Sequence, residues 1–228
     1  MFKKALRWPR GEQESAGDAL YVVGEKVLLR DKRISDIPDD YAWRRDPELS
    51  KLDATLPMQM SYDDYRRYAR EELSYNSRWS KRFAIDTLEA SDNGDGDEPE
   101  PGRHIGNCMY YDIDERRGET ELGIMVGDRD YWSRGYGTDA VTTMLDYIFT
   151  STKLNKVYLH TLTWNDRARK SFARSGFVEI REVRRNSIDF MRMELERQNW
   201  EAARSERVPG AADATEDEAP TPQPEPTP

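Results

Sequence analysis

Cysteine and histidine are scarce in this 228-residue sequence, and long apolar runs are absent. Cys108 is the only cysteine, which excludes a disulfide within the chain and any metal site built from several cysteines. The two histidines, His104 and His160, are far apart in the sequence, so we expect no metal site. No apolar run approaches the ~20 residues that a transmembrane helix needs. These absences favour a protein of the reducing cytoplasm without an integral membrane segment.

Basic residues are also fewer than acidic residues. The chain has 35 Lys and Arg against 44 Asp and Glu, a formal net charge of −9. Proteins that bind nucleic acids usually carry a concentrated basic face, so we expect no nucleic-acid partner. An acidic chain suits a cationic partner better. The composition leaves the oligomeric state open, a homodimer included.

Composition divides the chain into one domain and three polar segments. Residues 1–21 are predicted to be a flexible basic arm, and residues 204–228 a disordered tail rich in proline and acidic residues. Residues 22–197 form the expected domain, interrupted by an acidic loop at residues 91–103.

Hydrophobic periodicity predicts alternating strands and helices within this domain. The expected strands are residues 27–30, 83–86, 105–113, 120–126, 156–164, 178–183 and 188–195. The expected helices are residues 35–52 (broken near Pro47), residues 61–78, about three and a half turns after Gly137, and a short helix from Asn165 to Gly176.

Two glycines open the third of these helices. Gly135 and Gly137 would let the backbone approach an anion, and the N–H groups at the helix N-terminus would face it. The segment also matches the dinucleotide pattern G-x-G-x-x-A. However, residues 128–133 separate the strand from the glycines, and the next strand ends without the carboxylate that binds a ribose. A nicotinamide oxidoreductase is therefore disfavoured.

Several motifs in a fixed order resemble the GNAT acetyltransferases, in particular the branch of ribosomal-protein N-terminal and spermidine acetyltransferases. They are Tyr131-Trp-Ser-Arg-Gly-Tyr-Gly-Thr-Asp-Ala140, Glu121-Leu-Gly-Ile-Met-Val126, Asn165-Asp-Arg-Ala168 with Ser175-Gly-Phe177, and Asp40-Tyr-Ala-Trp43 with Asp46-Pro47. The resemblance covers about residues 24–197. It implies an α/β (α+β) fold, with a mixed, mostly antiparallel central sheet and helices on both faces.

The resemblance also implies acetyl-CoA as co-substrate and assigns the residues that bind it. In this family the fourth and fifth strands are parallel and splay apart, and pantetheine binds the exposed edge of the fourth strand. Met125 and Val126 match the positions whose backbone makes these contacts. The pyrophosphate is expected on the N–H groups of Arg134, Gly135, Tyr136, Gly137 and Thr138. Asn165 is expected to reach the pantetheine, and Arg169 the adenosine phosphate.

The implied reaction is the transfer of an acetyl group to a primary amine by direct attack in a ternary complex. Glu121 is the candidate general base, acting through a water molecule. The acceptor stays open: a protein N-terminus, a polyamine or a small-molecule amine.

Two residues depart from the family pattern. Trp132 stands where the glycine motif usually starts with Gln or Arg. Phe172 stands where many relatives have a tyrosine that protonates the leaving thiolate. Because a phenyl ring cannot donate a proton, the alternative is a module that binds acyl-CoA without catalysis. Ser171 points about 100° away around the helix and is a poor substitute.

Overall fold

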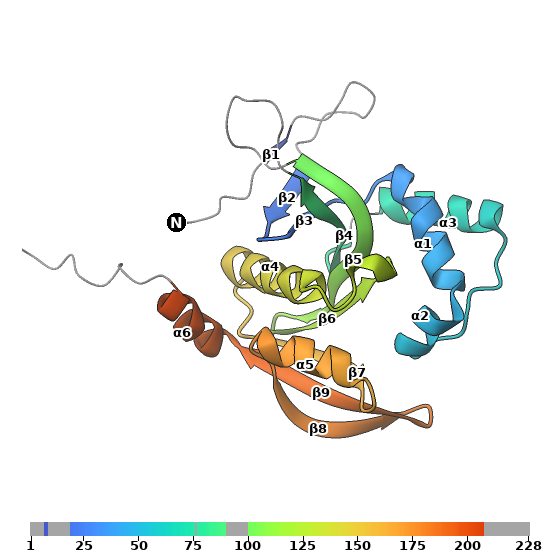
Figure 1. Ribbon diagram of the computed structural model, residues 1–228. Helices are drawn as coiled ribbons and strands as arrows, with labels where there is room; N and C mark the ends of the chain where they lie inside the picture. Colours follow the sequence, from blue (N-terminus) through green and yellow to red (C-terminus); the bar gives the residue numbers. More distant parts are fainter. Residues whose placement is uncertain (1–6, 9–18, 76, 90–99, 208–228) are drawn as a thin grey trace, which may run out of the picture.

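The computed structural model describes residues 7–8, 19–75, 77–89 and 100–207 (Figure 1). Most of the expected basic arm, acidic loop and acidic tail lies outside these residues. Four parts of these segments are described. Residues 7–8 form a strand, residues 19–21 belong to a second strand, residues 100–103 begin a third, and residues 204–207 end a helix.

Nine strands form one sheet in the order β1-β2-β3-β4-β5-β6-β7-β9-β8. The strands are β1 (Arg7–Trp8), β2 (Ala19–Val23), β3 (Val27–Arg30), β4 (Ser80–Glu89), β5 (Glu100–Asp114), β6 (Glu119–Val126), β7 (Lys156–Leu162), β8 (Val178–Arg185) and β9 (Ile188–Glu196). Among these described strands, β6 and β7 are the only parallel neighbours. The expected mixed, mostly antiparallel sheet is confirmed.

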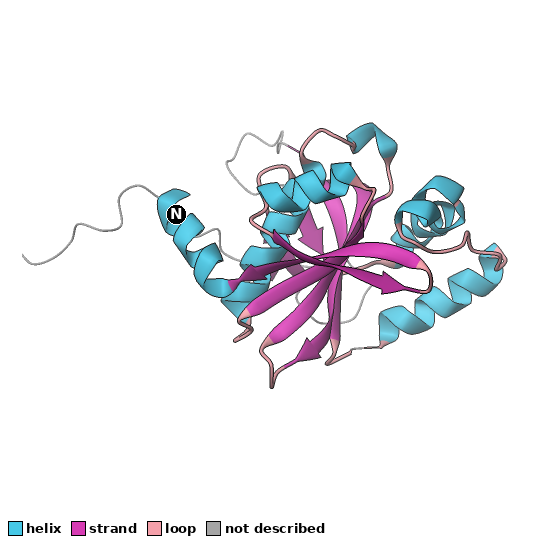
Figure 2. Ribbon diagram, turned by 90° about the horizontal axis from the view of Figure 1, so that it is seen from below, coloured by secondary structure: helices cyan, strands magenta, loops and turns pink. Residues whose placement is uncertain are grey.

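Helices lie on both faces of this sheet (Figure 2). They are α1 (Ile37–Arg45), α2 (Pro47–Leu52), α3 (Tyr62–Ser74), α4 (Tyr136–Ser151), α5 (Asp166–Arg174) and α6 (Arg197–Arg207), with short 3-10 turns η1 (Ile34–Asp36) and η2 (Arg129–Tyr131). The predicted break at Pro47 is confirmed, and Ser61 caps α3 by accepting the backbone N–H of Asp64. Helix α3 ends four residues before the expected end, and α6 was not predicted.

The main core lies between the sheet and α4. Within each strand, every second residue points to this face, and Leu29, Ile85 and Leu122 there meet the apolar stripe of α4. That stripe includes Met144 and Ile148, both fully buried. Cys108 packs in the same cluster, and burial raises the pKa of its thiol.

The opposite face carries a buried group of charges that attaches η1 and α1 to the sheet. Arg30 donates to both oxygens of Asp36 at 2.8 Å and to both oxygens of Asp86 at 2.5 and 2.9 Å. Burial alone would raise the pKa of Asp36, but the hydrogen bonds and charge of Arg30 outweigh it and hold that pKa below its ordinary value. The resulting stability is present above the ordinary pKa of an aspartate, about 3.9, and is lost as the pH falls.

We expect Arg30→Leu to lower the free energy of unfolding by about 3–5 kcal/mol, because it leaves two buried carboxylates without their partner. Urea unfolding at neutral pH measures this effect. Arg67→Leu is the matched control, since the Arg67–Asp64 pair is exposed and is worth about 0–1 kcal/mol. Similar losses in the two variants would contradict the assignment.

Candidate active site

Strands β6 and β7 pair over three residues and then diverge. Glu119, Thr120 and Glu121 pair with Lys156, Val157 and Tyr158, and no pairing follows toward the end of β6. Each strand keeps its other neighbour, because β5 follows β6 as far as Val126 and β9 follows β7 as far as Leu162. The edge of β6 beyond Glu121 therefore has no strand beside it.

The pairing with β5 decides which peptide groups lie on this edge. Gly127 donates its N–H to Ile105 of β5 at 2.9 Å, and neighbouring residues of a strand direct their peptide groups to opposite edges. The backbone N–H and C=O groups of Ile124 and Val126 therefore face the edge from which β7 diverges, and those of Met125 face β5. This geometry does not support the expected contacts of the Met125 backbone, and it points to Ile124 beside Val126 instead.

The carbonyl of Val126 already has one partner. Trp132 donates its indole N–H to this oxygen at 2.7 Å, and the guanidinium of Arg167 lies 3.8 Å from the centre of the Trp132 ring. Trp132, which departs from the family motif, thus connects the end of β6 to α5 and to the loop before α4 that contains Gly135 (the glycine loop).

The glycine loop reaches α4 through left-handed backbone conformations. Gly135 caps the helix with φ of 90°, and Ser133 has φ of 58°. At Gly137 a Cβ would lie 3.6 Å from a methyl group of Val126, so the loop is next to the end of β6. The first N–H groups of a helix lack partners within it and attract anions. The structure brings this anion-binding element beside the diverging edge.

A contact with the β2–β3 turn holds this helix end. Asp139, in the first turn of α4, accepts the backbone N–H groups of Glu25, Lys26 and Val27 at 2.8–3.1 Å. The Lys26 ammonium donates to the carbonyl of Arg134 at 3.1 Å. Lys26 therefore places a positive charge at the glycine loop, next to Arg134, which also contributes a guanidinium. Lys26 could not be identified from the sequence, because it lies 108 positions from Arg134.

Three other residues expected to bind acetyl-CoA have side chains that are hydrogen-bonded within the protein. Asn165 caps α5 by accepting the N–H of Ala168 at 3.2 Å, which leaves its amide N–H groups available. The hydroxyl of Thr138 is hydrogen-bonded to Ser171 at 2.8 Å. Arg169 binds both oxygens of Glu179 at 2.8 and 2.9 Å. This ion pair on β8 engages Arg169 away from the glycine loop, so the geometry does not support its expected role.

Glu121 occupies the last paired position before the strands diverge. Its side chain is 8% exposed, and its Oε1 lies 2.8 Å from Nδ1 of His160 on β7. Burial, followed by the negative charge of Glu121, raises the pKa values of Tyr111 and Tyr158. From the sequence, His160 was considered only as a metal ligand, and its separation from His104 argued against that role. Nothing in the sequence indicated its contact with Glu121.

Phe172 lies in the core against Phe177, with ring centres 6.1 Å apart. Among the aromatic side chains of α3 and the following turn, Tyr65 is buried beside Tyr41 of α1, with ring centres 5.4 Å apart. Tyr62 and Tyr68 on α3, and Tyr75 and Trp79 after it, are exposed.

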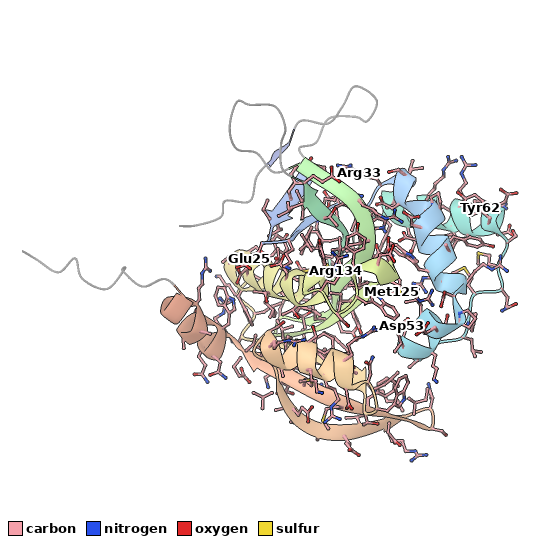
Figure 3. All side chains as sticks on the ribbon, in the orientation of Figure 1. Glu25, Arg33, Asp53, Tyr62, Met125 and Arg134 are labelled. Carbon is pink, nitrogen blue, oxygen red and sulfur yellow. The ribbon has the colours of Figure 1, made fainter. Side chains whose placement is uncertain are left out.

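Helix α2 lies near both sides of the diverging strands. Arg129, which follows β6, donates to Asp46 and Glu48 at 2.8–2.9 Å. Lys51 lies 5.4 Å from the ring centre of Trp164, which follows β7. Figure 3 labels Met125, Arg134 and Asp53 around this region.

The described residues contain no group of three or more His, Cys, Asp or Glu side chains arranged to hold a metal ion. In the same part of the chain, no helix is long and apolar enough to cross a membrane.

A family model described as an acetyltransferase (GNAT) domain matches residues 26–178. The chain belongs to the GNAT acetyltransferase family. It is an N-acetyltransferase that transfers the acetyl group of acetyl-CoA to an amine. The diverging edge of β6 and the glycine loop of α4 are consistent with this co-substrate, because one presents peptide groups and the other anion-binding N–H groups.

Similar proteins include acetyltransferases for different acceptors. An uncharacterized N-acetyltransferase p20 of Bacillus licheniformis is 40% identical over 134 residues, 58% of this chain and 68% of that protein. The alpha/beta-tubulin-N-acetyltransferase 9 of Homo sapiens is 23% identical over 70% of this chain and 75% of its own length. The spermidine N-acetyltransferase of Vibrio cholerae, solved with CoA and spermine, superposes with a TM-score of 0.63 at 19% identity, over 76% of this chain and 97% of its own.

We expect Lys26→Gln to raise the Kd for CoA roughly 3- to 10-fold, because it removes a charge beside the glycine loop. Isothermal titration at low and high salt measures this, and the difference should shrink as salt screens the charge. Lys153→Gln removes an equal charge from an exposed lysine just beyond the opposite end of α4. Equal affinities of the two variants would show that Lys26 does not contact the phosphates.

Proposed function

We propose that this protein acetylates a primary amine by direct attack on acetyl-CoA, with Glu121 as the general base. The amine approaches from the side on which α1, α2 and α3 lie together (the α1–α3 face; Figure 1). The observation that carries the proposal is the position of Glu121. It is buried at the last paired residue of β6, and the exposed peptide edge for pantetheine begins immediately after it.

The amine must lose its proton to become a nucleophile. A lysine-like amine has a pKa near 10.4 and an α-amine about 7.7–8.0, so both are largely protonated at neutral pH. The side chain of Glu121 shares a face with its cross-strand partners Tyr111 and Tyr158, opposite the face that packs on α4. Glu121 therefore faces the acceptor side and takes the proton, directly or through a water molecule.

Backbone groups supply the remaining polar contacts. An N–H of Ile124 or Val126 binds pantetheine and polarises the thioester oxygen. The N–H groups of residues 134–138 and the side chains of Lys26 and Arg134 bind the pyrophosphate. Asn165 contributes its amide N–H groups.

The leaving thiolate is not protonated by the residue at the position where many relatives have a tyrosine. Phe172 has no acidic proton and is buried in the core. Because a CoA thiol is a fair leaving group, water or another hydroxyl is sufficient for this step.

The acceptor belongs to one of three classes: a polyamine, a protein N-terminus or a small-molecule amine. The similarity to the spermidine N-acetyltransferase of Vibrio cholerae supports a polyamine, and the similarity to the human tubulin N-acetyltransferase supports a protein acceptor. The net charge of −9 favours an acceptor that carries additional positive charge. We infer a cytoplasmic location from the single cysteine, and a homodimer is an open part of the proposal.

The acceptor is tested by acetyl-CoA-dependent thiol release with spermidine, peptides with a free N-terminus and an aminoglycoside. We expect release with at least one amine above the rates without acceptor and without enzyme. Mass spectrometry of the product should show one added acetyl group on nitrogen. Binding of acetyl-CoA without release for any amine would contradict transfer to these classes.

We expect Glu121→Gln to lower kcat about 10²- to 10⁴-fold, because an amide cannot accept the proton of the amine. The KM for acetyl-CoA should change little, since the side chain points away from the peptide edge that binds pantetheine. Glu119→Gln, two residues earlier on the same face and also on β6, is the matched control. A Glu121→Gln enzyme with unchanged kcat would rule out this base.

A further inference from the structure

The hydrogen bond between Glu121 and His160 joins β6 to β7 just where their backbone pairing ends. Glu121 is paired with Tyr158, and His160 follows two residues later on the diverging part of β7. Both side chains are nearly fully buried, with exposed fractions of 8% for Glu121 and 5% for His160. The 2.8 Å contact between Oε1 and Nδ1 therefore crosses the point of divergence inside the protein.

The second ring nitrogen of His160 determines where the proton lies. Arg185, the last residue of β8, has a guanidinium nitrogen 3.3 Å from Nε2 of His160. A guanidinium only donates hydrogen bonds, so Nε2 must accept with its lone pair. The imidazole is then neutral, and its proton is on Nδ1, directed at Glu121. Two contacts on opposite sides of the ring select the same tautomer.

Other charged and titratable groups surround this pair. Tyr111 on β5 and Tyr158 on β7 share the face of Glu121, and its charge raises the pKa of each, after burial. Arg192 on β9 lies 3.9 Å from the ring centre of Tyr158.

We propose that His160 is a positioning residue of the acetyl-transfer reaction. Its Nδ1–H holds one oxygen of the Glu121 carboxylate, and the other oxygen remains to accept the proton of the amine. Arg185 keeps His160 in the tautomer that can donate. This inference rests on the proposed role of Glu121, because a carboxylate without a catalytic role would need no such orientation.

The kinetic test compares His160→Leu with His160→Asn. An asparagine amide N–H lies near the position of Nδ1, so it restores the donor, whereas leucine fills the space without one. We expect His160→Leu to lower kcat about 10- to 100-fold with little change in the KM for acetyl-CoA. The acidic limb of its kcat profile should move to higher pH, because a carboxylate that has lost a donor binds a proton more tightly.

His160→Asn should recover most of the rate and of the pH profile. Urea unfolding of both variants separates positioning from simple loss of a contact between strands. Arg185→Leu should give a smaller loss than His160→Leu, and its control is Arg184→Leu, whose ion pair with Asp189 is exposed. An unchanged pH profile in His160→Leu, or no recovery in a stably folded His160→Asn, would overturn the proposal.

A measurement that does not depend on activity completes the test. The chain has two histidines, so the ¹⁵N signals that disappear in His160→Asn identify His160. We expect the shifts of a neutral imidazole protonated on Nδ1, and a change of these shifts in Glu121→Gln. Protonation on Nε2 would refute the inference. If Glu121→Gln keeps full activity while the Nδ1–H signal is present, the proposed base is wrong and the contact is structural.

Discussion

The early end of the pairing between β6 and β7 is the constraint on which the rest of the site depends. Each strand is held over its length by its other neighbour, β5 or β9, so neither can follow the other beyond Glu121 and Tyr158. Peptide groups without a strand partner must find another one, since their burial unsatisfied would cost free energy. The pantetheine of acetyl-CoA has amide groups that suit this edge, so the fold forms a binding surface by leaving a sheet incomplete.

The two faces of the sheet divide the work between packing and polar chemistry. The face toward α4 is apolar and holds the glycine loop beside the end of β6, through Val126 and the contact of Asp139 with the β2–β3 turn. The opposite face buries charged groups beside polar partners, with Arg30 between two carboxylates and Glu121 beside the imidazole of His160. Because a buried charge is tolerated only with a hydrogen-bonding or charged partner, each of these side chains is held in one position. That constraint suits a group that must meet the amine at a defined place.

In the proposed site, acetyl-CoA is bound mainly by backbone groups. Peptide edges and helix N-termini are set by the fold, so they tolerate a change of side chain such as Trp132 in the glycine motif. Phe172 and the ion pair of Arg169 with Glu179 show two side chains that do not take the roles implied by the family resemblance. The proposed acceptor approaches from the α1–α3 face, where aromatic side chains of α3 are exposed.

The sequence by itself determined the order of the main elements, the GNAT fold, the glycine motif before α4 and the candidate base Glu121. These follow from local patterns: the alternation of apolar residues, capping residues such as Ser61, and glycines with a characteristic spacing. The tertiary structure alone decided that Ile124 replaces Met125 at the open edge, that Lys26 reaches the glycine loop, that Arg169 turns to Glu179, and that His160 meets Glu121. Each of these depends on strand register or on contacts between residues far apart in the chain, from 10 positions for Arg169 to 108 for Lys26. Periodicity along a chain says which face a residue occupies, but only the pairing of strands says which residue lies opposite.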